Sequence, residues 1–341
     1  MRNGIGRGIL AGILWAAILI GLAGARGAFG GAAAAAGKAE TASKTEAAGE
    51  DGAFPALNEA GFLDAGEFVY ENPEDGVWRY AGSDLRVEIY RRQTTKPNQV
   101  WYEAEIWCGE GGDVPHMVVN DPDNWLRGGE YPYKICRKYG VVIAVSSDYA
   151  QTRVQQKLGS GIGIVIRDGK VISAKTRKKN ASTFPNLDTL ALYPDGDIRV
   201  FYSNEKTAEE YLADGARDVL AFGPWLFRDG EDNTAALAKY GKSAAPRVAV
   251  GMVEKGHYFF MMLEGRIKRS KGGPVSFLAE KLKERGCTVG FNLDGGDTAS
   301  IVFMGHQLCR MVDSGNRSSR RTSDILGVGY SALLPAYGDP W

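Results

Sequence analysis

The sequence predicts a single α+β domain, with a mixed and mostly antiparallel β-sheet core and a few peripheral helices. Short apolar or alternating runs typical of strands recur from residue 85 onward, and several are joined by turns containing Asp-Gly. Helical periodicity is confined to a few segments, chiefly 207–215 and 275–286. Because strands joined by tight turns pair with each other, hairpins should supply much of the sheet and helices should cover it.

The region before residue 76 is expected to lie outside this domain. An apolar run at 9–22 follows two arginines and precedes Ala-Gly-Ala, so residues 1–25 are expected to be a signal peptide or a membrane anchor. Residues 26–75 are expected to be a flexible tether and lead-in, since 30–52 is rich in Ala and Gly and has no aromatic residue. The protein should be secreted or anchored on the outer face of the cytoplasmic membrane, with membrane contact only through this N-terminal segment.

Residues 76–335 form the predicted domain, which is long enough to bury a sizeable core. Lys and Arg total 41, as do Asp and Glu, and the formal net charge of zero argues against a nucleic-acid partner. The charged run 167–179 is expected to be a solvated turn and strand face. The four cysteines allow two disulfides or four small buried thiols, and the sequence leaves both open.

The first half of the domain should be rich in hairpins. After an irregular lead-in at 54–80, the alternating runs 85–89 and 100–106 are expected to pair. Further hairpins are expected at 162–172 and 190–202, each around an Asp-Gly turn.

Two helices have clear end signals. Thr207 and Glu210 form a capping box, and Gly215 should end the helix that follows. The second helix has apolar residues at helical spacing from Val275 and should end at Gly286.

A continuous apolar run at 141–145 predicts a buried strand. It is followed at once by the polar residues Ser146, Ser147, Asp148 and Tyr149. Polar groups at the end of a buried strand are well placed to bind a ligand, so this segment is a candidate part of a site.

The stretch 287–304 is the most concentrated group of polar residues in the chain. Two apolar runs, 289–291 and 301–304, flank a turn that carries carboxylates, an amide and hydroxyls. The polar and glycine residues of this turn are Asn292, Asp294, Gly295, Gly296, Asp297, Thr298 and Ser300. Its glycines would let a ligand approach the backbone closely, although Asp-Gly between apolar runs is also a plain hairpin signal.

This turn resembles the Asn-Leu-Asp-Gly-Gly-Gly-Ser segment of the phosphodiester glycosidase family. Asp294, Gly295 and Gly296 match the segment, and Asp297 stands in place of its third glycine. Other segments resemble the family in the same order along the chain, at 146–149, 221–226, 246–251, 264–266 and 321–324. Each motif is weak by itself, but the ordered set is specific.

The resemblance implies a hydrolase of sugar 1-phosphodiesters. Cleavage on the sugar side needs a carboxylate that attacks the anomeric carbon or activates water. We assign this role to Asp294 as a hypothesis, with Asp148 as its acid/base or sugar-binding partner. Glu264, which replaces an aspartate of the family, completes the expected catalytic set.

A phosphate leaving group needs cationic stabilisation more than a proton, and the planar guanidinium of arginine matches two phosphate oxygens. The candidates are Arg247, Arg266 and Arg321, for each of which a surface ion pair is the alternative. The other residues expected to bind substrate are Tyr149, Gly223, Gly295, Gly296, Asp297, Thr298 and Ser300.

The function expected is extracytoplasmic hydrolysis of sugar 1-phosphodiester bonds in a phosphorylated glycan, such as a teichoic-type polymer or exopolysaccharide. The alternative is a tethered glycan-binding envelope protein without turnover, because Ser146, Ser147 and Asp297 depart from the family pattern. No cofactor is expected. Asp294 and Asp297 could also hold Ca²⁺, although two carboxylates are few for a dedicated site.

Overall fold

The computed structural model describes residues 52–123, 125, 129–149, 163–176, 187–240, 243–310 and 320–334. The predicted signal segment and the first half of the predicted tether lie outside these residues, and the domain boundaries stay predictions. No helix within the described ranges is long and apolar enough to cross a membrane.

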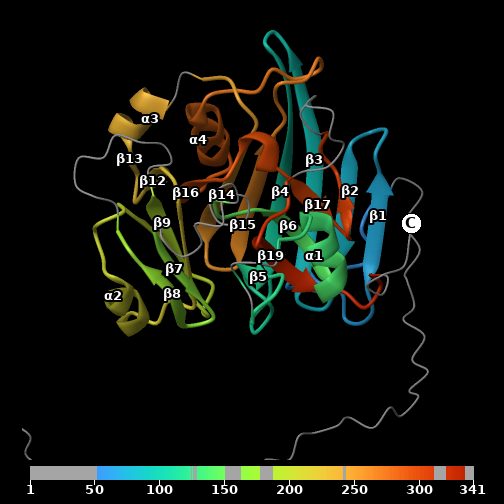
Figure 1. Ribbon diagram of the computed structural model, residues 1–341. Helices are drawn as coiled ribbons and strands as arrows, with labels where there is room; N and C mark the ends of the chain where they lie inside the picture. The colour runs from blue at the N-terminus through green and yellow to red at the C-terminus, as the bar shows by residue number, and fades with distance from the viewer. Residues whose placement is uncertain are drawn as a thin grey trace, which may run out of the picture. The chain divides into compact units, whose positions relative to one another are not determined.

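Three β-sheets form the framework of the described chain (Figure 1). The largest has nine strands in the order β1-β2-β3-β4-β15-β14-β16-β12-β13. In chain order these are β1 (Phe68–Asn72), β2 (Val77–Ala81), β3 (Leu85–Thr95), β4 (Asn98–Cys108), β12 (Trp225–Arg228), β13 (Glu231–Asp232), β14 (Arg247–Glu254), β15 (His257–Leu263) and β16 (Val289–Leu293).

The two smaller sheets have five strands each. The second runs β10-β9-β11-β7-β8, with β7 (Ile164–Arg167), β8 (Lys170–Ala174), β9 (Asp188–Leu192), β10 (Ile198–Phe201) and β11 (Asp218–Phe222). The third runs β18-β17-β6-β19-β5, with β5 (His116–Val119), β6 (Val141–Ser146), β17 (Ile301–Phe303), β18 (His306–Gln307) and β19 (Asp324–Tyr330).

The predicted fold class is confirmed. All strand pairings among the described residues are antiparallel. The hairpins predicted from alternation and Asp-Gly turns form as β3–β4, β7–β8 and β9–β10. One apolar cluster includes residues from all three sheets, such as Ile143, Leu190 and Phe260, so the sheets pack around a common core.

The helices are short and peripheral, as predicted. They are α1 (Pro132–Tyr139), α2 (Ala208–Ala213), α3 (Thr234–Tyr240) and α4 (Val275–Glu284). The capping box of α2 is present at Thr207 and Glu210. Gly286, with φ +81°, follows α4, whose buried face packs against the large sheet.

Two expectations need correction. Residues 54–80 contain β1 and β2 in place of an irregular lead-in, because Phe68 and Trp78 bury their side chains in the fold. The four cysteines are free thiols, so the disulfide alternative is not realised. Burial raises the pKa of Cys287 and Cys309 to about 12, as expected for inert core thiols.

Candidate functional site

The predicted central turn connects two different sheets. β16 leads into it from the large sheet, where it pairs with β14 and β12. β17 leads out of it in the third sheet, where it pairs with β6 and β18. The two apolar runs therefore do not form a hairpin with each other. We call the connection, residues 294–300, the crossing loop; it contains a 3₁₀ turn at Gly296–Thr298.

The crossing loop is hydrogen-bonded to the end of β6. The backbone N–H of Asp294 donates to the carbonyl of Ser147 at 3.0 Å, and the Ser146 hydroxyl donates to the carbonyl of Asp294 at 3.0 Å. The N–H of Ser300 donates to the Ser146 hydroxyl at 3.3 Å. The two segments predicted to carry carboxylates of the site are thus side by side, and Ser146 joins them.

The glycines of the loop are needed for close packing. A Cβ at Gly295 would lie 2.6 Å from the carbonyl oxygen of Pro246, which is too close for any other residue. Gly296 has φ +59° and donates its N–H to the same oxygen at 3.0 Å. This packing holds the loop against the start of β14, where Arg247 lies.

Arg247 is buried without a carboxylate partner among the described residues. The residue is 7% exposed. Among the described residues its guanidinium donates only to the carbonyls of Gly273 and Ser243 and to the Ser243 hydroxyl, at 3.0–3.3 Å. Burial, together with the nearby charge of Arg266, lowers the pKa of Arg247 to about 10. A buried guanidinium without an anion is costly, so this position favours a negatively charged ligand.

Arg266 and Asp297 form an ion-pair group at the edge of the crossing loop. The guanidinium of Arg266 lies 3.2 Å from Asp297, and that of Arg320 lies 2.9 Å from the other oxygen of the same carboxylate. Arg321, which the resemblance indicated, is exposed, and its guanidinium carbon lies 5.3 Å from the centre of the Tyr131 ring. Arg320 is thus the arginine of this segment that pairs with Asp297, and substrate binding by Arg321 stays a prediction. The two arginines are adjacent and identical, so the sequence cannot show which of them pairs with Asp297.

The third predicted carboxylate, Glu264, is fully buried and neutralised. Arg269 binds both of its oxygens, and the backbone N–H of Arg310 donates to it at 2.7 Å. The hydroxyl of Tyr102 lies 3.4 Å away. Glu264 thus fixes the segment after β15, and its catalytic role stays a prediction.

Asp148 belongs to a buried ion-pair group that the sequence did not reveal. Its Oδ2 accepts from Arg167 at 2.7 Å, and its Oδ1 accepts from the N–H of Tyr149 at 2.6 Å. Arg167 also donates to Asp324 at 2.9 and 3.1 Å, and Asp324 accepts from the indole of Trp125. Burial opposes the charge on Arg167, but Asp324 and Asp148 outweigh it and raise its pKa.

The prediction that residues 167–179 form a solvated turn and strand face is therefore wrong for the first of them, Arg167. Arg167 is 5% exposed, because the β7–β8 turn begins only after it and its side chain lies against β11. The exposed residues of this hairpin are those that follow, such as Asp168 and Lys170.

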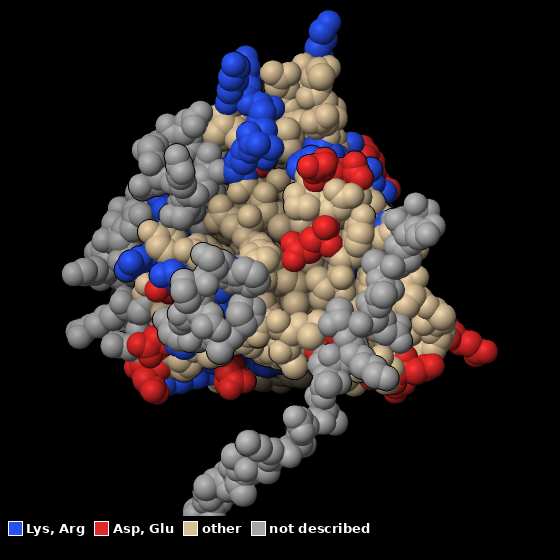
Figure 2. Space-filling model, turned by 90° about the vertical axis from the view of Figure 1, so that its right-hand side faces the viewer, with Lys and Arg blue, Asp and Glu red and all other residues tan. Residues whose placement is uncertain are grey.

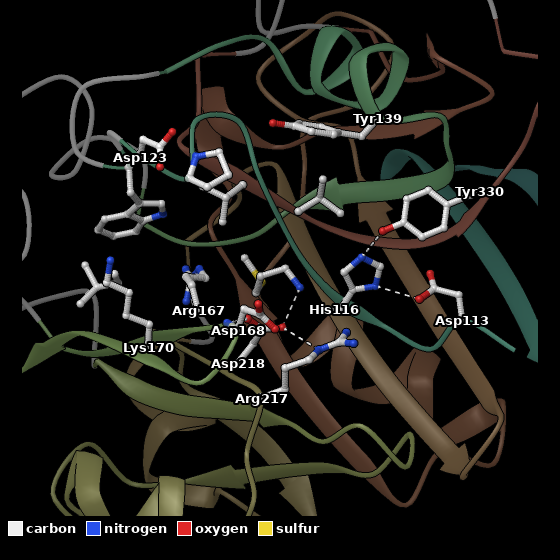
Figure 3. A pocket seen from close by; sticks show the side chains of 16 residues that line it. Asp113, His116, Asp123, Tyr139, Arg167, Asp168, Lys170, Arg217, Asp218 and Tyr330 are labelled. Atoms are coloured by element: carbon white, nitrogen blue, oxygen red, sulfur yellow. Dashed lines mark hydrogen bonds and ion pairs between the residues drawn. The ribbon is translucent and has the colours of Figure 1, made fainter. Parts of the chain in front are cut away.

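Arg167 also lines a cavity of about 560 Å³ (Figure 3). At one end of the cavity the His116 ring bonds to the hydroxyl of Tyr330 and lies 3.3 Å from Asp113. Asp218, in its wall, accepts the N–H groups of Met117 and Asp168. None of the residues predicted for the substrate site lines this cavity.

Two predicted binding residues lie near β11. Tyr149 packs against Phe222 with ring centroids 5.6 Å apart. Gly223 has φ +75°, and its carbonyl accepts from Asn292 at 2.8 Å. These contacts place the segment after β6, the end of β11 and the end of β16 together.

The hydroxyls of Thr298 and Ser300 and the Oδ1 of Asn292 are buried and have no hydrogen-bond partner among the described residues. Buried polar groups normally have partners, so this cluster around the crossing loop is unusual. Whether the two hydroxyls bind substrate stays a prediction.

The metal alternative gains no support from Asp297, both of whose oxygens pair with arginines. No group of three or more His, Cys, Asp or Glu side chains arranged to hold a metal occurs in the part of the chain that the structure describes.

Fold and site together define an α+β protein in which carboxylates and guanidinium groups meet around a glycine-containing loop. The family model for phosphodiester glycosidases matches residues 139–329, and the chain belongs to this family. The resemblance of the sequence motifs is thereby confirmed.

Two other comparisons give similar proteins. The fold is similar to the catalytic domain of zebrafish N-acetylglucosamine-1-phosphodiester alpha-N-acetylglucosaminidase, with a TM-score of 0.56, 18% identity, and coverage of 72% of this chain and 84% of that one. An uncharacterized SPbeta prophage-derived protein of Bacillus subtilis, YomE, is 26% identical over 174 residues. That match covers 50% of this chain and 26% of the relative.

Proposed function

We propose that this protein hydrolyses the bond between a sugar and a phosphodiester, in an extracytoplasmic phosphorylated glycan. The observation that carries the proposal is Arg247, buried beside the crossing loop without a carboxylate partner among the described residues. A phosphate bound there would supply the missing negative charge. Family membership and the N-terminal signal pattern support the reaction type and the location, respectively.

In the proposed reaction Asp294 acts at the anomeric carbon, as nucleophile or as the base that activates water. Arg247 and Arg266 bind the phosphate and stabilise the charge that it gains as the glycosidic bond breaks. The leaving group is a phosphate monoester, which is a weak base, so proton donation is of little importance. Both oxygens of Asp148 already accept hydrogen bonds, so we assign it to substrate orientation.

The test is turnover of a panel of synthetic sugar 1-phosphodiesters by the wild type and by Asp294→Asn. We expect the wild type to release free sugar and the variant to lose activity by roughly a thousandfold or more, as for loss of a catalytic carboxylate. Circular dichroism and the melting temperature should stay close to wild type. Asp195→Asn, at an exposed hairpin turn, is the matched control and should retain full activity. Turnover by Asp294→Asn would refute the assignment.

A second candidate is a glycan-binding protein with the same fold and no turnover. It is favoured by Asp148 and Asp297, whose carboxylates are both engaged by arginines. Binding of the diesters by the wild type, without release of sugar from any member of the panel, would support this candidate over the enzyme.

A further inference from the structure

A group of unpaired basic residues lies next to the proposed phosphate site. We call it the basic rim and define it as Lys96, Lys268, Lys271 and Arg310. All four are exposed, and none has an acidic partner among the described residues. An unpaired lysine on a surface is common, but four basic side chains on neighbouring segments repel one another.

The segments that carry the rim are tied together by backbone contacts. The N–H of Lys271 donates to the carbonyl of Asn98 at 3.0 Å, just after the β3–β4 turn that carries Lys96. Lys268 lies in the tight turn closed by the bridge between Ile267 and Ser270.

The rim is continuous with the site through Arg266 and Glu264. Arg266 hydrogen-bonds through its backbone to Lys271, and its side chain pairs with Asp297 of the crossing loop. Arg310 joins the group because its N–H binds the carboxylate of Glu264.

The nearby acids do not neutralise the rim. Glu264 is held by Arg269, and Asp297 is held by Arg266 and Arg320, so each is already balanced. In Figure 2 Lys and Arg side chains gather at the top, where the β3–β4 hairpin projects in Figure 1. Below them the surface is hollowed and mostly uncharged, apart from Asp and Glu side chains beside the hollow. This local excess contrasts with a formal net charge of zero for the whole chain.

We propose that the basic rim binds further phosphates of a polymeric substrate, so that the substrate is a glycan with repeating phosphodiesters. This inference rests on the proposed function, since it places one phosphodiester at Arg247 and Arg266 and the next ones along the rim. A substrate with a single phosphate would not need the cations beyond Arg266. Repeating negative charges would also steer the polymer to the site.

Other anionic partners fit the rim less well. Single-stranded nucleic acids are bound by basic grooves that also carry aromatic stacking platforms. Among the described residues the exposed large hydrophobic side chains are Val171, Tyr202 and Tyr330, and none belongs to the segments of the rim. A basic patch alone does not anchor a protein stably to a membrane, because stable anchoring takes a second signal such as inserted apolar side chains, and the rim has none.

The test uses a rim variant, the double substitution Lys268→Gln/Lys271→Gln. Its matched control is Lys170→Gln/Lys175→Gln, which removes two exposed lysines at β8 that also lack acidic partners among the described residues. Each variant and the wild type is assayed with a synthetic monomeric sugar 1-phosphodiester and with an oligomer of the same sugar joined by repeating phosphodiesters. For the rim variant we expect kcat/KM for the oligomer to fall roughly tenfold through KM, with the monomer unchanged. The control should match the wild type on both substrates.

The salt dependence gives a second readout. The preference of the wild type for the oligomer should shrink as ionic strength rises, and the rim variant should show less of this dependence. Equal loss on monomer and oligomer, or no loss on either, would overturn the inference.

Direct binding of the oligomer separates failure of this inference from failure of the proposed function. If the wild type binds the oligomer without hydrolysing any substrate, the proposed function fails. The inference about the rim is still supported in that case if the rim variant binds the oligomer more weakly than the wild type and the control do. If poly-glutamate of equal charge binds the wild type as tightly as the oligomer, the assignment to phosphates is wrong.

Discussion

Two buried arginines in this chain have opposite electrostatic surroundings. Arg167 is 5% exposed and is paired with both Asp148 and Asp324. Arg247 is 7% exposed and has only carbonyl and hydroxyl acceptors among the described residues. The nearby carboxylates raise the pKa of Arg167 against the effect of burial, whereas burial and Arg266 lower that of Arg247.

The difference supports the proposal that Arg167 stabilises the fold and Arg247 binds the substrate. A buried charge is tolerated when partners and hydrogen bonds offset the loss of hydration. Around Arg167 the fold supplies those partners itself. Around Arg247 the protein alone leaves the positive charge without an anion, and the crossing loop with Asp294 lies next to it. In the proposed function, a negatively charged ligand supplies the anion that the second arrangement lacks.

The largest expected effect is on stability, from Arg167→Met. Removal of this guanidinium leaves the carboxylates of Asp148 and Asp324 buried side by side without a cation. We expect the free energy of unfolding to fall by about 3–5 kcal/mol, measured by urea denaturation. Arg199→Met, which removes an exposed arginine that pairs with Asp197, is the control and should cost less than about 1 kcal/mol. A loss for Arg167→Met no larger than that of the control would contradict the comparison.

Arg247→Met should have the opposite profile. Its free energy of unfolding should stay within about 1 kcal/mol of wild type, because an unpaired buried charge is replaced by an apolar side chain. Its kcat/KM on sugar 1-phosphodiesters should fall by roughly a hundredfold or more, because an interaction with the phosphate is lost.

Inorganic phosphate provides a test of Arg247 that needs no turnover. Phosphate should raise the melting temperature of the wild type but not that of Arg247→Met, since only a ligand bound to the folded state stabilises it. Arg199→Met, at an exposed ion pair with Asp197, should respond to phosphate like the wild type. Equal stabilisation of wild type and Arg247→Met would show that the anion binds elsewhere.

Most of the fold could be predicted from the sequence because its signals are local. Alternation and Asp-Gly turns specify β3–β4, β7–β8 and β9–β10, and end signals specify α2 and α4. The crossing loop could not be recognised as such. Whether two neighbouring strands pair with each other or with strands from elsewhere depends on long-range packing, and here β16 and β17 join different sheets.

The site was predictable to the extent that it lies within ordered motifs. Asp294, Arg247 and Arg266 were predicted in this way, and the structure places them around one loop, but their roles stay predictions. Arg167 was missed, because a single arginine before an Asp-Gly turn gives no sign that its side chain is buried. The choice between Arg320 and Arg321 depends on which side chain faces Asp297, which adjacent identical residues cannot reveal.

The smallest expected effect is the contribution of Arg247 to the pH dependence of the free energy of unfolding. Its pKa in the folded state, about 10, is below that of an exposed arginine, so between these values the unfolded state binds more protons. Stability therefore rises with pH through this window. Between pH 7 and pH 10 the free energy of unfolding of the wild type should rise by about 0.5 kcal/mol relative to that of Arg247→Met. The relative rise should be larger above pH 10. Urea unfolding of both proteins at the two pH values measures this, and the difference between them removes contributions from the Tyr and Lys residues that they share. Saturating phosphate should abolish the gain, because a bound anion restores the charged form of the guanidinium.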